Sequence, residues 1–207
     1  MTRSYTMVRL FWLILLLAGG VFGLIRHVQT RPIPRPPGVL APHAPFQAQL
    51  TPQSDLRLEK PGFRFEPVAY IEIEARVLSK RRYRYDAASS ISPVDLALGW
   101  GRMSDTAIIR KLRIWQADRF YFYGWGQNPP IPESEVAMSS ANMHLIPGNP
   151  NIDLRLRRLK PGHLVQIKGF LVNVTGPNGF LWRTSTLRTD TGNGACEIVW
   201  VADLAVR

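Results

Sequence analysis

The chain has 207 residues, 45% of them hydrophobic and 20% charged, and a formal net charge of +11 at pH 7. A single cysteine, Cys196, excludes an internal disulfide framework, so a hydrophobic core must hold the fold. No cysteine closely follows the N-terminal apolar run, which excludes lipoprotein processing.

The N-terminus predicts a membrane anchor. Residues 1–9 form a short basic head, and the sixteen residues Leu10–Ile25 carry no charge. As a helix this run covers about 24 Å, somewhat less than the ~30 Å hydrocarbon core of a bilayer. It has no polar face, which argues against a buried helix of a soluble protein. We predict a transmembrane anchor over residues 10–27 that contacts the lipid bilayer through Leu10–Ile25; a cleaved signal peptide is the alternative.

A tether and one domain are predicted after the anchor. Residues 28–60 are expected to form a proline-rich tether, because residues 31–52 contain seven prolines and little apolar periodicity. Residues 61–207 then form the domain. Arg26, Arg31 and Arg35 after the span favour a cytoplasmic domain, whereas the basic head and the stiff spacer favour export, which we prefer.

The domain alternates short helices and strands. Ile71, Ile73, Ala75 and Val77 face one side of a first strand over residues 69–78. The other predicted elements are helices starting at Ser92-Pro93, at the cap Ser104-Asp105, after Pro132 and over 152–159, and strands over 119–125, 164–174, 180–186 and 196–202. We predict an α+β fold: a small curved antiparallel sheet or partial β-barrel of about five strands with short inserted helices, preceded by one transmembrane helix.

A basic cluster ends the first strand. Lys80, Arg81, Arg82 and Arg84 are candidates for contact with anionic headgroups at the membrane surface. The alternatives are a solvated face and a nucleic-acid contact. Nucleic acid is disfavoured as a partner, because the anchor already holds the domain at a membrane.

Aromatic residues and arginines are candidates for a partner-binding surface, since both are enriched where proteins bind each other. Stacking of sugars or bases, or simple filling of the core, are the alternatives. The candidates are Trp100, Arg102, Arg119, Tyr121, Tyr123, Trp125 and Trp182.

Catalytic signals are weaker. Cys196 and His144 could form a nucleophile and base, with Asp105 or Asn142 orienting the imidazole. Burial of the cysteine on an apolar strand and a structural histidine explain the same residues. No HxxxH or CxxC spacing predicts a metal site, and no cofactor is expected.

Four blocks carry a resemblance: Tyr83–Asp86, Ser92–Asp105, Ser140–Pro147 and Asp190–Glu197. Over residues 71–201 the chain resembles an uncharacterised family of bacterial single-span membrane-anchored envelope proteins. The resemblance implies a one-domain envelope protein and brings no catalytic residue with it. We therefore predict a single-pass protein of the bacterial inner membrane with a periplasmic C-terminal domain, non-enzymatic, that binds a protein partner or serves as accessory subunit of a membrane complex. The alternatives are an envelope enzyme using Cys196 and His144, and a basic barrel that binds nucleic acid if the domain is cytoplasmic.

Overall fold

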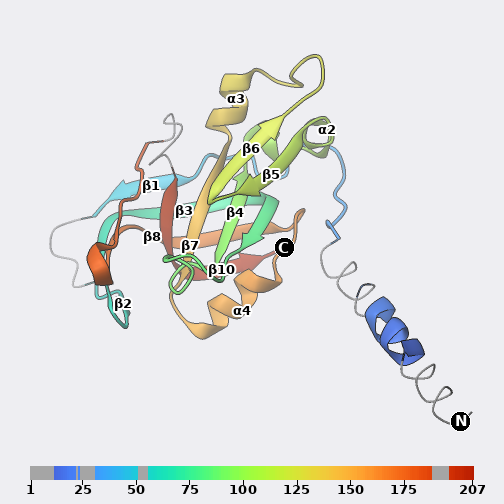
Figure 1. Ribbon diagram of the computed structural model, residues 1–207. Coiled ribbons are helices and arrows are strands. Elements are labelled where there is room, and N and C mark those ends of the chain that lie inside the picture. Colours follow the sequence, from blue (N-terminus) through green and yellow to red (C-terminus); the bar gives the residue numbers. More distant parts are fainter. Residues whose placement is uncertain (1–11, 22, 24–30, 51–55, 188–195) are drawn as a thin grey trace, which may run out of the picture. The chain divides into compact units, whose positions relative to one another are not determined.

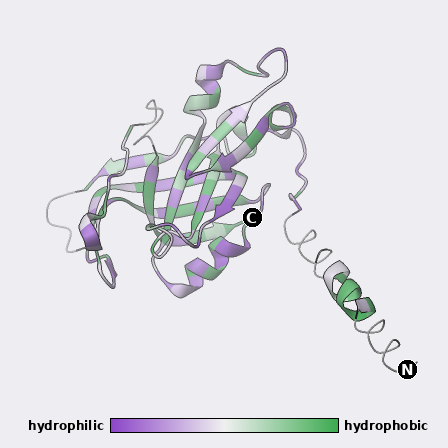
Figure 2. Cartoon of the chain, in the orientation of Figure 1, coloured by the Kyte–Doolittle hydropathy of each residue, from purple (hydrophilic) through white to green (hydrophobic). Residues whose placement is uncertain are grey.

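The computed structural model describes residues 12–21, 23, 31–50, 56–187 and 196–207. The chain divides into two units, residues 1–32 and residues 33–207. In the first unit, residues 12–21 form a helix that is mostly hydrophobic (Figure 2). Among the described residues, no helix has both the length and the apolar character that crossing a membrane requires. The predicted head, and residues 10, 11, 22 and 24–27 of the predicted anchor, lie outside the described residues.

The second unit is built on one large, mostly antiparallel sheet with helices beside it, so the predicted α+β class is confirmed (Figure 1). In the described part of the chain this sheet has eight strands, and the prediction of about five is wrong. The strands are β1 (Phe46–Gln49), β2 (Glu59–Lys60), β3 (Phe63–Arg82), β4 (Val94–Gly99), β7 (Ser140–Pro147), β8 (Leu164–Thr175), β9 (Leu181–Trp182) and β10 (Glu197–Val206).

Strand β3 is long enough to pair with both β8 and β4 along its length, besides the short strands β1 and β2. Its first part pairs antiparallel with β8, from Arg64 opposite Thr175 to Arg76 opposite Leu164. Its last part pairs antiparallel with β4, which in turn pairs with β7. β10 lies between β7, to which it is parallel, and β8, to which it is antiparallel. The pairing β3–β4–β7–β10–β8 therefore returns to β3.

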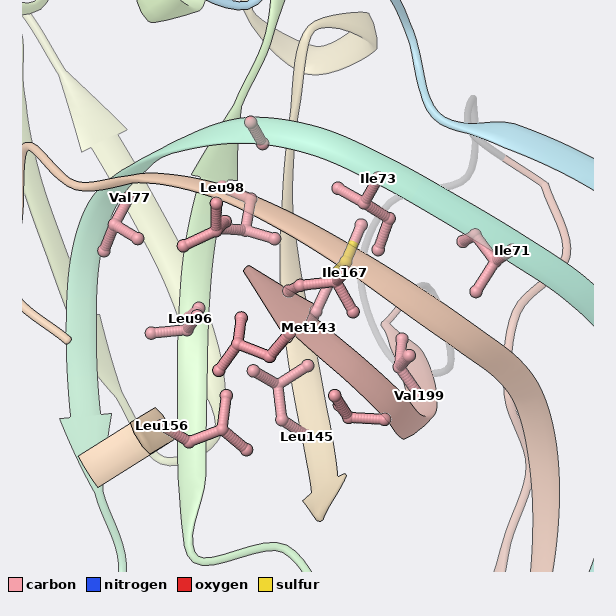
Figure 3. Packing of buried hydrophobic residues seen from close by; sticks show 14 of the residues in the cluster. Ile71, Ile73, Val77, Leu96, Leu98, Met143, Leu145, Leu156, Ile167 and Val199 are labelled. Carbon is pink, nitrogen blue, oxygen red and sulfur yellow. The ribbon is translucent and has the colours of Figure 1, made fainter. Parts of the chain in front are cut away.

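The inner faces of these five strands share one hydrophobic core (Figure 3). The alternation predicted in the first strand is confirmed, because Ile71, Ile73, Ala75 and Val77 are all buried. They meet apolar side chains from the other strands and from helix α4 (Pro150–Arg158). Those side chains include Leu96, Leu98, Met143, Leu145, Leu156, Ile167 and Val199.

The helix predicted at Ser92-Pro93 is wrong, since Val94–Gly99 is strand β4. The local capping signal is overridden because β4 is hydrogen-bonded on both sides, to β3 and to β7. All six of its residues are buried, with Val94, Leu96 and Leu98 in the main core. Alternation of these three residues in the sequence was the competing signal.

The other predicted helices are present. Asp105 caps α2 (Thr106–Ile109), since its Oδ1 accepts a hydrogen bond from the N–H of Ala107 at 2.7 Å. Helix α3 (Glu133–Met138) follows Pro132, and α4 follows the cap Asn149. Single turns lie at η1 (Gly101–Ser104) and η2 (Pro177–Gly179). The strand predicted over residues 180–186 is reduced to the two residues of β9.

The folded unit starts earlier than the predicted domain boundary at residue 61. Strands β1 and β2, from the segment expected as a tether, pair with β3. Residues 33–41 also bond to the domain: the N–H of Ile33 donates to the carbonyl of Pro161, and Ala41 is fully buried. A proline-rich segment can pack in this way because its carbonyls and remaining N–H groups still find partners.

Candidate functional site

A β-hairpin separate from the main sheet joins α2 to α3. Its strands β5 (Arg113–Ala117) and β6 (Phe120–Gly124) pair with Trp115 opposite Phe122. The strand pattern places side chains alternately on two faces. Ile114, Tyr121 and Tyr123 pack inward with a second apolar cluster, which includes Leu78, Ala97, Met103, Ile131 and Val136. The hairpin therefore lies over the outer side of β4 and β7 (Figure 1).

The opposite face of the hairpin carries exposed aromatic residues. The rings of Trp115 and Phe122 are stacked, with centroids 5.4 Å apart and planes 14° apart, although both residues are about two-fifths exposed (42% and 39%). The guanidinium of Arg113 lies 5.4 Å from the Trp115 ring centroid, and Phe120 is the next ring beyond Phe122. We call Arg113, Trp115, Phe120 and Phe122 the aromatic face.

The tip of the hairpin is fixed by Arg119. Its Nε and Nη2 donate to the two carboxylate oxygens of Asp86, at 2.9 and 2.8 Å. Its Nη1 donates to Oδ1 of Asp95 at 2.8 Å and to the carbonyl of Ser92 at 3.0 Å. The guanidinium also lies 3.9 Å from the Tyr83 ring centroid. Bidentate, charge-assisted bonds of this kind are among the strongest in proteins.

The second aspartate of this group is fully buried beside a histidine. Oδ2 of Asp95 lies 2.9 Å from Nδ1 of His144, at an angle outside hydrogen-bond geometry, and His144 is 2% exposed. Trp182 covers the histidine, with ring centroids 4.6 Å apart. Because the guanidinium of Arg119 is paired with the carboxylate of Asp95, it compensates the cost of burying that carboxylate. We call Arg119, Asp86, Asp95 and His144 the ion cluster.

The cluster perturbs the ionisation of Asp86 and Arg119. Burial opposes ionisation of Asp86, but the hydrogen bonds and charge of Arg119 outweigh it, so the pKa of Asp86 is lowered. The same ion pairs outweigh burial at Arg119 and raise its pKa further. Both shifts stabilise the charged forms, which is the pattern of a structural ion pair.

Side-chain amides hold the backbone of the hairpin tip. Nδ2 of Asn142 donates to the carbonyl of Arg119 at 2.8 Å, and Nε2 of Gln116 donates to Oδ1 of Asn142 at 2.6 Å. The N–H of Arg119 donates to the hydroxyl oxygen of Tyr83 at 3.0 Å. Both polar groups of the Arg119 peptide backbone are thus bonded to side chains of the domain.

The candidate catalytic residues are only partly brought together. Asn142 and His144 lie on β7, and Cys196 precedes β10, whose register places Glu197 opposite Met143. Sγ of Cys196 lies 3.9 Å from the carbonyl oxygen of Arg119. The imidazole of His144 faces Asp95, whereas Asp105 caps α2 and also accepts from the N–H of Gly38 at 2.8 Å. Hydrogen bonds to those backbone groups lower the pKa of Asp105.

The candidate partner-binding residues divide into buried and accessible groups. Trp100 is 3% exposed, and burial strongly raises the pKa of Tyr121. Arg119 and Trp182 belong to or cover the ion cluster. Arg102 is exposed and pairs with Glu135 at 3.2 Å, while Trp125 stacks on Tyr123 at 6.1 Å.

The partner-binding candidates named from the sequence did not include the aromatic face, and neither aspartate of the ion cluster was named as a site residue. The available signal was the alternation of Arg113 with Trp115 and of Phe120 with Phe122, which places all four on one face. No sequence signal indicates that Asp86 and Asp95 meet Arg119, because the contact depends on how the hairpin folds back.

The basic cluster at the end of β3 contains one residue that is bonded within the fold and three that are exposed. Nζ of Lys80 donates to the carbonyl oxygens of Arg157 and Leu159, at the C-terminal end of α4. Burial, with the neighbouring Arg82 and Lys160, lowers the pKa of Lys80 to about 8. Lys80 therefore has a structural role, while Arg81, Arg82 and Arg84 are exposed.

In the described ranges of the chain, no group of three or more His, Cys, Asp or Glu side chains is placed to hold a metal ion. No family model matches the chain, and comparisons with curated proteins and with solved structures likewise find no match.

Proposed function

We propose that the protein is a non-enzymatic binding module of the bacterial envelope. Residues 10–27 would tether it to the inner membrane, with the C-terminal domain in the periplasm. The domain would bind a protein partner, as a stand-alone module or as an accessory subunit of a membrane complex. The aromatic face of the β5–β6 hairpin would be the surface that binds.

The observation that carries this proposal is the exposed, stacked pair Trp115 and Phe122. Aromatic residues and arginine are enriched at the centres of protein interfaces and contribute most of the binding energy there. Arg113 sits over the same surface, so an aromatic anchor and a cation are presented together. Basic neighbours Arg110 and Lys111 favour a partner with acidic residues around its aromatic-binding pocket.

The hairpin is suited to binding because it is already rigid. Its inner face is packed, and its tip is held by the ion pairs of Arg119. A preorganised surface loses little conformational entropy when a partner docks, which leaves more of the interaction energy for affinity.

The scaffold beneath the hairpin fits the same proposal. We infer that the pairing of β8 back to β3 closes the curved sheet into a partial barrel. A scaffold of this kind positions loops and hairpins without taking part in chemistry itself. The side of β4 and β7 that lies under the hairpin carries Asp95 and His144, which are buried.

The alternatives receive less support. His144 is 2% exposed and contacts Asp95 and Trp182, so an incoming substrate would not reach it without movement of Trp182. A structural role explains its contacts more simply than catalysis with Cys196. A nucleic-acid partner along β4 and β7 would have to displace the hairpin and break the ion cluster.

The test is site-specific photo-crosslinking of the full-length protein in cells. A benzophenone amino acid at position 115 or 122 should give one discrete cross-linked product, and the same label at Phe46 is the control. Phe46 is 60% exposed on β1, so it is more accessible than either hairpin residue and differs in location.

Substitution then tests the contribution of the surface. The double variant Trp115→Ser, Phe122→Ser should lose any stoichiometric companion that copurifies in mild detergent, while Phe46→Ser keeps it. Retention of the companion by the double variant, or equal cross-linking from position 46, would contradict the proposal.

A further inference from the structure

A basic pocket lies beside the ion cluster, between the end of β3, the β3–β4 loop and the hairpin tip. It is open to solvent and has a volume of about 580 Å³. Volumes of this size are typical of small-ligand sites. The residues lining it are Arg81, Arg82, Tyr83, Arg84, Tyr85, Asp86, Asp118 and Arg119, which we call the arginine pocket.

The positive charge of the arginine pocket is only partly compensated. Both carboxylate oxygens of Asp86 already accept hydrogen bonds from Nε and Nη2 of Arg119. By contrast, in the part of the chain that the structure describes, the guanidinium groups of Arg81, Arg82 and Arg84 make no hydrogen bond or ion pair. Each guanidinium carries five N–H donors, so many directed donors remain available in a small volume.

Neighbouring groups add to the positive potential. Partial burial, and then the charges of Arg157 and Arg84, lower the pKa of Arg82, with only Asp153 acting in the opposite direction. Asp153 is itself paired with Arg157 at 2.9 Å. Four arginines but only two aspartates, Asp86 and Asp118, line the arginine pocket, so its guanidinium groups outnumber its carboxylates.

The walls of the arginine pocket are ordered by the ion cluster. Tyr83 packs under the Arg119 guanidinium, and its hydroxyl oxygen accepts from the Arg119 N–H. Tyr85 is 95% exposed at the rim, where its hydroxyl can donate to a ligand. The arginine pocket therefore combines one fixed wall with several free donors.

We propose that the arginine pocket binds a phosphate group, held by the guanidinium groups of Arg81, Arg82 and Arg84. Planar guanidinium groups bind phosphate oxygens through paired N–H bonds. Three uncompensated guanidinium groups exceed what the two oxygens of one carboxylate need, whereas a phosphate offers more oxygens and more charge. The phosphate belongs either to a phospholipid headgroup or to free phosphate. The proposal does not depend on the aromatic face.

The experiment measures arginine labelling by phenylglyoxal in the full-length protein, residue by residue, by mass spectrometry. The protein is held in non-ionic detergent micelles in a phosphate-free buffer. One arm adds inorganic phosphate, and the other adds phosphatidylglycerol to the micelles. At ten times the dissociation constant of the probe, labelling of Arg81, Arg82 and Arg84 should slow about tenfold. Arg110, which is exposed at the C-terminal end of α2 and does not line the arginine pocket, is the internal reference.

Both positive outcomes support a phosphate site and distinguish its source. Protection by inorganic phosphate identifies free phosphate as sufficient, and protection only by phosphatidylglycerol identifies the lipid headgroup. Absence of protection in both arms, or equal protection of Arg110, would overturn the proposal. So would protection that requires a single-stranded oligonucleotide and is produced by neither phosphate probe.

A double variant tests cooperation among the arginines. Arg82→Gln with Arg84→Gln should weaken protection of Arg81 at least about tenfold, since each charge-assisted bond contributes substantially to binding. The fold should be retained, because the replaced groups have no partners to lose. Arg110→Gln is the matched control and should leave protection unchanged. Undiminished protection of Arg81 in the double variant would overturn the proposal.

Discussion

Arg119 connects segments that are distant in the chain. It binds Asp95 and Asp86, which lie 24 and 33 residues earlier, and it does so from a two-residue turn. Asp118 and Arg119 both have positive φ, at 48° and 69°, as a two-residue hairpin turn with right-handed twist requires. This conformation is unfavourable for residues with a side chain. The ion pairs and the bonds to the Arg119 backbone offset that cost.

We expect Arg119→Met to destabilise the domain strongly. The substitution keeps the aliphatic stem but leaves the carboxylate of Asp95 buried without a compensating charge. Breaking a buried ion pair on one side typically costs about 3–5 kcal/mol. The free energy of unfolding, measured by urea denaturation of the full-length protein in mild detergent, checks this value.

Arg110→Met is the control for this substitution, because Arg110 is exposed and loses only surface charge. It should change the free energy of unfolding by no more than about 0.5 kcal/mol. Equal effects of the two substitutions would mean that the ion cluster does not stabilise the hairpin.

At the level of elements, the pairing of strand β8 depends on the close approach of its Gly169 to the backbone of Trp200 in β10. Gly169 lies opposite Ile71 of β3 on one side and Val201 of β10 on the other. A Cβ built at this position would lie 1.9 Å from the carbonyl oxygen of Trp200, which is backbone and cannot move aside easily. The glycine therefore permits β8 to pair closely with both neighbours at the point where β10 has its irregular register.

Gly169→Ala should destabilise the sheet by about 1–3 kcal/mol or more, as overpacking of a filled region does. Gly126→Ala is the matched control, because a Cβ there meets nothing within 4 Å. Thermal unfolding followed by circular dichroism checks both. If the midpoint temperature of unfolding of Gly169→Ala equalled that of the control, the requirement for glycine at position 169 would be contradicted.

Elements with local signals were predictable, and those decided by pairing were not. The Asp105 cap and the helix after Pro132 depend on groups within a few residues, so α2 and α3 were found from the sequence. Strand β4 was mistaken for a helix because its two hydrogen-bonded neighbours are distant in the chain. The aromatic face was missed for a related reason: burial of Tyr121 and exposure of Trp115 depend on what covers the hairpin.

At the level of the whole folded unit, residues 33–41 act as a strap across the domain. The N–H groups of Leu40 and Ala41 both donate to Oγ of Ser104, and the N–H of Gly101 donates to the carbonyl of Ala41. Arg35 donates from Nε to the carbonyl of Gly162 at 2.9 Å. The strap thus forms hydrogen bonds with polar groups of the domain that would otherwise lack these partners.

A chain that starts at Pro42 should be less stable than a chain that starts at Ile33, by about 3 kcal/mol for the buried and half-buried hydrogen bonds lost. Both truncated chains lack residues 1–32, so the comparison isolates the strap. Urea denaturation of the two proteins side by side measures the difference. Equal midpoints would mean that residues 33–41 behave as the tether that the proline content predicts.

The sequence by itself determined the α+β class, the core face of the first strand and the Asp105 cap of α2, because each follows from periodicity or hydrogen bonding within a few residues. It also determined where the apolar, proline-rich and basic segments lie. Only the tertiary structure decided that Arg119 meets Asp86 and Asp95, that Lys80 is used inside the fold, and that Trp115 faces solvent. The physical reason is that sheet register and hairpin packing, which join residues far apart in the chain, set the partner and the burial of each of these side chains.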